Sequence, residues 1–145
     1  MRILRVTSAL LALALSPLAL ADGARFSVRI DPGLAPSPVS GRLVISVIRP
    51  GARLAVDADP NDAPFWDDPQ PMFGRDVRGL TPDAPAVIAD DADHSIEPLA
   101  ALKPGEYRAA ARLLGPRTRS EWREEAGHLY SEPVTFTITA DGPAE

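Results

Sequence analysis

The spacing of proline constrains this chain more than any other feature of its sequence. Sixteen prolines are spread over 145 residues, and proline breaks helices because it lacks an N–H and clashes with the preceding turn. Beyond residue 21 they leave no run of about 12 helix-favouring residues outside 105–128. Short runs of alternating apolar and polar residues remain, which is the period of a half-buried strand. The sequence therefore predicts an all-β fold.

The first 21 residues have the pattern of a secretory signal peptide. Arg2 and Arg5 form a positive segment, Ala9–Leu15 is apolar, and Ala19–Ala21 has the small-x-small form of a cleavage site. An uncleaved N-terminal helix is the alternative, although the apolar run is too short to anchor a chain in a membrane. We expect cleavage after Ala21 and export to the periplasm or the cell exterior. We expect no membrane span in the mature chain, since no later segment approaches about 18 apolar residues.

Charge and cysteine content exclude several classes of function. The chain has no cysteine, so a disulfide framework, a thiolate nucleophile and a cysteine-ligated metal site are impossible. Its 15 basic and 20 acidic residues give a net charge of −5, whereas a nucleic-acid binder needs a basic face. We therefore expect no nucleic-acid partner.

The prolines and the alternating runs together predict one domain. A signal peptide is expected at 1–21, a β-sandwich at 22–140 and a flexible tail at 141–145. Residues 41–48 are apolar on both faces, which indicates a central, doubly covered strand. Residues 107–113 also suit a helix, but they follow a Pro-Gly turn without an N-cap, so a strand is favoured. Seven strands are predicted, at 25–30, 41–48, 72–77, 85–89, 95–99, 102–113 and 129–138.

A tyrosine after a tight turn narrows the fold class further. Pro104 and Gly105 form the turn, and Tyr107 opens the strand that follows it. In immunoglobulin-like sandwiches a tyrosine at this place returns its hydroxyl to the backbone of the preceding corner. A surface tyrosine after a turn is the alternative. The pattern predicts an immunoglobulin-like or fibronectin-III-like two-sheet Greek-key sandwich of about seven strands.

The sequence predicts no catalytic residue. It has no Gly-x-Ser-x-Gly, hence no nucleophile elbow, and its two histidines, His94 and His128, lie in charged loops. Acidic residues are abundant, but nothing in their surroundings would desolvate one of them and make it a general acid. No cofactor is expected.

Two acidic segments raise the question of a metal site. Asp57–Asp68 begins like an EF-hand loop, but its sixth position is Asp62 instead of glycine, and Pro60 interrupts it. A looser calcium site between this segment and Asp90–Asp93 is one interpretation, and His94 beside Asp93 is a weak zinc candidate. A solvated acidic surface that aids solubility is the favoured interpretation, so no metal ligand is assigned.

Four aromatic residues are candidate binding residues. Rings in loops can stack on a sugar or anchor a partner protein. The alternative for the first three is a place in the core, at the end of the sandwich, and this alternative is favoured. The four are Phe65, Trp66, Phe73 and Trp122.

Six segments over residues 25–139 together resemble a known family: Val39–Val47, Pro64–Trp66, Pro71–Val77, Pro82–Ile88, Leu102–Tyr107 and Leu129–Val134. They are similar to the N-terminal β-sandwich domain of exported esterases of the α/β-hydrolase class, the enterochelin-esterase-like proteins. In that family a hydrolase domain follows the sandwich and carries the serine nucleophile with its histidine and acid. No position here matches those residues, so the resemblance implies a non-catalytic module.

Three functions remain open. The first is an exported, non-catalytic sandwich that binds or supports a hydrolase or a cell-envelope protein. The second is the remnant or front domain of a truncated esterase. The third is a small calcium- or carbohydrate-binding domain.

Overall fold

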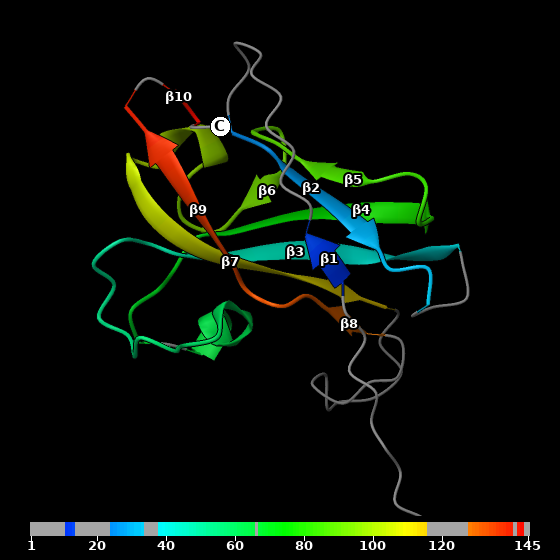
Figure 1. Cartoon of the computed structure of the whole chain (residues 1–145), viewed down its shortest axis with the longest axis horizontal. Helices are drawn as coiled ribbons and strands as arrows, with labels where there is room; N and C mark the ends of the chain where they lie inside the picture. Colours follow the sequence, from blue (N-terminus) through cyan, green and yellow to red (C-terminus); the bar gives the residue numbers. More distant parts are fainter. Residues whose placement is uncertain are drawn as a thin grey trace, which may run out of the picture.

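The computed structural model describes residues 11–13, 24–33, 38–65, 67–115, 128–140 and 142–143. They form two antiparallel sheets with two short 3-10 helices (Figure 1). The predicted all-β sandwich is confirmed.

The smaller sheet has the order β1-β2-β5, from Leu11–Leu13, Phe26–Ile30 and Ala86–Ile88. β2 pairs antiparallel with both neighbours. Its side chains alternate between core and surface as predicted. Phe26, Val28 and Ile30 are buried, whereas Arg29 is exposed.

The larger sheet has β3 near its centre, paired with β4 on one side and β7 on the other. The central position predicted for residues 41–48 is thus confirmed. The order of the sheet is β10 (Gly142–Pro143), β9 (Val134–Thr139), β7 (Gly105–Leu114), β3 (Val39–Ile48), β4 (Met72–Leu80) and β6 (Asp93–His94), and β8 (Leu129–Tyr130) pairs with β7.

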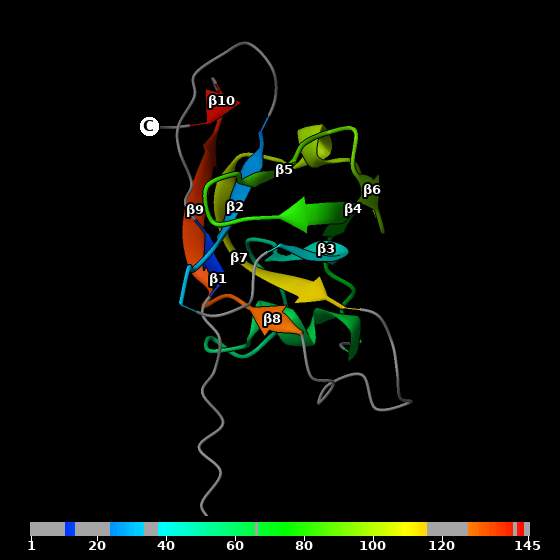
Figure 2. The same cartoon turned by 90° about the vertical axis from the view of Figure 1, so that its right-hand side faces the viewer.

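A single core fills the space between the sheets. Figure 2 shows β2 and β9 at the left of the molecule and β3 and β4 at the right, with β7 running from one side to the other. Leu43, Ile45 and Val47 of β3 are fully buried in this core. The ring of Phe136 links the two sheets, because it meets Phe26 edge-on at 5.3 Å and stacks on Tyr107 at 5.3 Å.

The face of β3 that points away from the core is also covered. The 3-10 helix η1 (Pro60–Phe65) contacts β3 and β7 on this side. Ser46 and Ala110 lie opposite each other there and are fully buried. The polar residue Ser46 in this apolar strand therefore does not indicate exposure to solvent.

Residues 105–114 form strand β7, not a helix, and the tyrosine corner is present. The Tyr107 hydroxyl donates to the carbonyl oxygen of Lys103 at 2.6 Å. Gly105 has a φ of +152°, and a Cβ there would lie 2.6 Å from Cγ of Pro50. Only glycine fits this turn. Whether the connections are those of an immunoglobulin or a fibronectin-III domain stays a prediction.

The strand predicted at 95–99 is wrong. The ladder runs earlier, at Asp93–His94, and the chain then bends into the 3-10 helix η2 (Leu99–Ala101). The hydroxyl of Ser95, in place of a carbonyl, accepts from the Met72 N–H at 3.0 Å, which ends the ladder. Pro98 has no N–H to continue it, and Leu99 is buried in the core instead.

The single strand predicted at 129–138 is divided in two. β8 and β9 are separated at residues 131–133, where Ser131 bonds to Ala111 through its main-chain N–H and its hydroxyl. Pro133 lies in this interruption, where its missing N–H is not needed for a ladder. Residues 142–143 pair with Thr139 and Ile138 of β9, and the flexible tail expected at 141–145 stays a prediction.

Candidate functional site

The predicted aromatic binding residues do not form an exposed site among the described residues. Phe73 is 1% exposed in the core, paired with Ile45, so its ring cannot stack on a ligand. Its assignment as a binding residue is corrected to a core role. The backbone of Phe65 belongs to η1, but its side chain, and all of Trp66 and Trp122, lie outside the described residues.

The acidic segments are engaged in local bonds. Three aspartate side chains accept main-chain N–H groups: Asp59 from Asn61, Asp68 from Arg53 and Asp90 from Ala100. The bond of Asp59 spans two residues and shapes a turn, as aspartate commonly does, whereas those of Asp68 and Asp90 join positions 15 and 10 residues apart in the chain. In the part of the chain that the structure describes, no three acidic or histidine side chains are placed to share a metal ion. The geometry gives no support to the calcium alternative.

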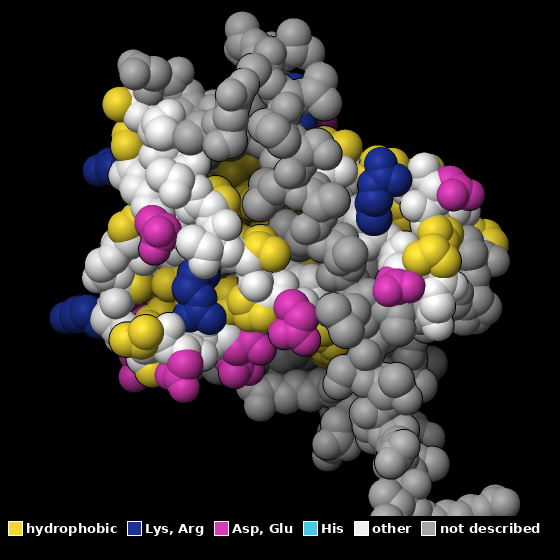
Figure 3. Space-filling model, viewed as in Figure 1, with side chains coloured by type: hydrophobic (Ala, Val, Ile, Leu, Met, Phe, Trp, Pro, Cys, Tyr) yellow, Lys and Arg dark blue, Asp and Glu magenta, His cyan; other side chains and the backbone are white. Residues whose placement is uncertain are grey.

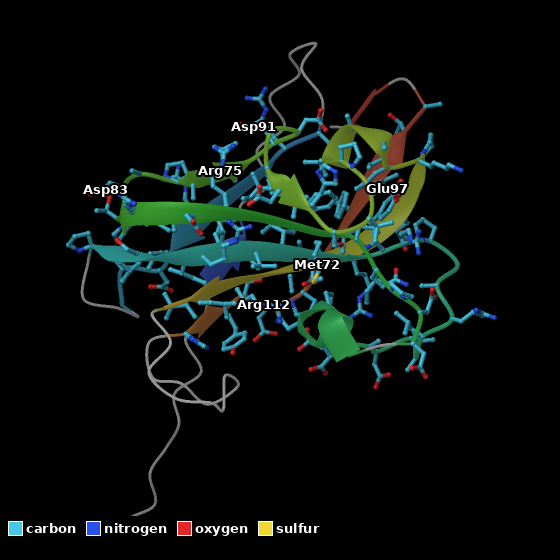
Figure 4. The ribbon with its side chains drawn as sticks, turned by 180° about the vertical axis from the view of Figure 1, so that it is seen from behind. Met72, Arg75, Asp83, Asp91, Glu97 and Arg112 are labelled. Atoms are coloured by element: carbon cyan, nitrogen blue, oxygen red, sulfur yellow. The ribbon has the colours of Figure 1, made fainter. Side chains whose placement is uncertain are left out.

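Ion pairs join β6 and the turn before it to the strands β3 and β4 of the same sheet. Arg42 contacts Asp93 at 2.5 Å and Asp76 at 3.2 Å, and Arg75 contacts Asp91 at 2.5 Å (Figure 4). The hydrogen bond that Arg42 donates to Asp93 is the main cause that raises the pKa of Arg42, against a smaller opposing effect of burial. All of these side chains are more than a third exposed, so each pair contributes only about 0–1 kcal/mol. They are structural contacts.

Arg112 is a buried cation that sequence reasoning missed. It projects from β7 toward η1, beside Met72 (Figure 4), and is 5% exposed. One guanidinium nitrogen donates to the carbonyl oxygen of Asn61 at 3.0 Å, and another lies 3.8 Å from the Met72 sulfur. Burial lowers the pKa of Arg112, while Tyr130 and Asp62 oppose that shift. The alternation of β7 places Arg112 on its outer face, but that pattern cannot show that η1 covers this face.

Arg112 is one of three arginines that hold the connection 50–71 in place; Arg108 and Arg112 lie on β7, and Arg49 directly follows β3. Each donates to a main-chain carbonyl of that segment: Arg49 to Pro69 at 2.9 Å, Arg108 to Val56 at 2.7 Å and Arg112 to Asn61 at 3.0 Å. Carbonyl groups in a proline-rich segment lack ladder partners, and guanidinium groups satisfy them. These arginines therefore hold the segment in place, and we assign them a structural role.

The edge of β2 is the candidate interaction site. β1, which pairs with this edge, lies within the predicted signal peptide, with Leu11 opposite Ile30, Ala12 opposite Arg29 and Leu13 opposite Val28 (Figure 1). Loss of β1 on cleavage would leave one edge of β2 without a neighbour. An open edge presents a row of main-chain donors and acceptors that can pair with another strand.

The described residues on the face shown in Figure 3 carry interspersed basic and acidic side chains. His94 lies on β6 at one edge of the larger sheet, and His128 directly precedes β8. No helix among the described residues is long and apolar enough to cross a membrane.

Comparison with family models, curated proteins and solved structures finds no match. The likeness to esterase-associated sandwiches therefore rests on the sequence segments alone.

Proposed function

We propose that the chain is an exported, non-catalytic β-sandwich module that binds a protein partner, either a hydrolase or a cell-envelope protein. The observation that carries this proposal is the position of β1. The structure fills one edge of β2 with three residues of the predicted signal peptide. Signal cleavage would thus give the exported protein an edge suited to a protein partner.

The strand orders support an immunoglobulin-like connection within this proposal. In such domains strands A, B and E share one sheet, and strands C, F and G share the other. The order β1-β2-β5 and the adjacency of β3, β7 and β9 correspond to these sets. In these terms, signal cleavage would remove strand A and leave strand B at the edge.

The test is recovery of the naturally processed protein from the periplasm and the culture medium through a C-terminal tag. Intact mass should give a chain that begins at Asp22, and one partner should co-purify in stoichiometric amount, absent from a tag-only control. Recovery of the protein alone from both compartments, or hydrolysis of ester substrates by the purified chain, would contradict the proposal.

A further inference from the structure

The β2 edge, once β1 has left, cannot be refilled by the residues just before β2. Only residues 22–25 lie between the predicted cleavage site and Phe26. An antiparallel return needs a turn of at least about two residues, so too few would remain to pair with Val28 and Ile30. The place of β1 must therefore be taken by another segment or stay open.

The side chains of β2 define what such a segment must offer. Val28 and Ile30 are buried toward the core, whereas Arg29 between them is exposed on the outer face. A strand in the register of β1 meets these residues at three successive positions. Since directly opposite residues on paired strands share a face, the incoming strand needs apolar residues opposite Val28 and Ile30. Opposite Arg29, an acidic residue fits best.

Charge disfavours a second copy of this chain as the occupant. Arg25, directly before β2, and Arg29 fall on the same face of the alternation, with Ser27 between them. No symmetric antiparallel pairing centred on Ser27, Val28 or Arg29 gives Arg29 an acidic partner: one centred on Ser27 opposes it to Arg25, one on Val28 opposes it to Ser27, and one on Arg29 opposes it to itself. Like charges directly opposite each other destabilise a sheet. The pattern favours a segment from a different protein.

We propose that the β2 edge binds an extended segment of another protein, antiparallel to β2, with an acidic residue flanked by apolar residues at alternate positions. This inference rests on the proposed function and specifies its partner. β1 occupies the site before cleavage, and it also contacts β7, so it closes the sandwich between the two sheets. Removal of the signal peptide would thus free this edge of β2 for a partner strand.

The test measures binding of two labelled peptides to the naturally processed protein by fluorescence anisotropy. Both contain the sequence of residues 8–16 with polar flanks, one with Ala12→Asp and the other with Ala12→Lys. The Ala12→Asp peptide should bind about fivefold more tightly, the ratio that one favourable cross-strand charge pair gives. The variant Arg29→Glu should reverse this preference. Arg78→Glu, an equal change of charge at an exposed position of β4, should leave it unchanged.

The full, unprocessed chain purified from the cytoplasm is the second arm. It should bind either peptide at least tenfold more weakly than the processed protein, because β1 competes for the edge. Four results would overturn the inference: equal binding by the unprocessed chain, no preference between the peptides, no binding at millimolar peptide, or a dimer of the processed protein that Arg29→Glu dissociates. If the peptides fail but one partner still co-purifies, the proposed function stands and only the β2 edge is wrong.

Discussion

Replacing Tyr107 by phenylalanine tests the tyrosine corner with a change of one oxygen atom. The hydroxyl donates to the carbonyl oxygen of Lys103 at 2.6 Å, and the ring stacks on Phe136 at an interplanar angle of 17°. Tyr107→Phe removes the hydrogen bond and keeps the ring. A net contribution of about 1 kcal/mol is expected for such a bond. Lys103 is exposed, so water can reach its carbonyl oxygen and the loss should not exceed about 1.5 kcal/mol.

The free energy of unfolding, measured by urea titration at pH 7, checks this value. The melting temperature should fall by about 4 °C in a domain of this size. Tyr107→Leu removes the ring as well and should cost roughly 3 kcal/mol, because an aromatic residue is truncated in the core. The comparison separates the hydrogen bond from the packing.

The free energy of unfolding at alkaline pH provides a second test of the same substitution. Burial, followed by the negative charge of Glu97, raises the pKa of Tyr107. In the unfolded chain the phenol ionises near pH 10. Above that pH the unfolded state binds fewer protons than the folded state, so stability falls as the pH rises. The phenylalanine variant lacks this loss, and the stability gap should narrow above pH 10.

An unchanged free energy of unfolding in Tyr107→Phe at pH 7, with a gap that stays constant to about pH 11, would refute the reasoning. That result would mean that the hydroxyl gains no more from Lys103 than from water.

Two further substitutions test local features of the larger sheet. Ser131→Ala removes the acceptor of the fully buried Ala111 N–H and should cost about 1–3 kcal/mol with faster hydrogen exchange at that amide, whereas the exposed Ser40→Ala should cost less than about 1 kcal/mol. An equal cost at both serines would contradict the role of burial. Gly41→Ala would place a Cβ 2.3 Å from a main-chain oxygen of β7 and should lower stability by about 1–3 kcal/mol. Gly33→Ala, whose Cβ would have the Asp31 carboxylate at 3.4 Å as its nearest neighbour among the described residues, is the thermal-unfolding control and should be nearly neutral.

The fold class and the central strands could be predicted because their side chains alternate over several residues. In β2 every second residue is apolar and buried, so the pattern alone gives both the strand and its core face. In β3 the apolar residues on both faces indicate a central strand instead, and Leu43, Ile45 and Val47 are the buried core residues. β7 could be separated from a helix because a Pro-Gly turn precedes Tyr107. The sequence pattern of these strands reflects burial, to which many residues contribute together.

The errors arise where a single side-chain bond decides the outcome. Ser95 ends one ladder with its hydroxyl, and Ser131 interrupts another in the same way. Alternation cannot reveal such bonds, since serine is also common on exposed strand faces. For Phe73, by contrast, the strand predicted at 72–77 and the favoured place in the core both agree with the structure, because it pairs with Ile45 and is buried.

The candidate site could not be predicted because it depends on strand order. The sequence indicates both β2 and the signal peptide, but only the pairing of Leu11–Leu13 with Val28–Ile30 joins them. Arg112 was missed for a related reason. The outer face of β7, on which Arg112 lies, is covered by a segment about fifty residues away in the chain, and no local sequence pattern indicates that contact.

The pairing of β3 with β7 sets how fast the protein can fold. Ile48 pairs with Arg108 and Arg42 with Leu114, so the centre of the sandwich forms only after the chain has closed a loop that holds β4, β5 and β6. Closure of a long loop costs entropy before any contact rewards it, and sandwiches of this kind fold on the order of milliseconds to seconds. During that interval unpaired apolar strands are open to aggregation. The length of this vulnerable period is fixed by the topology more than by any one side chain.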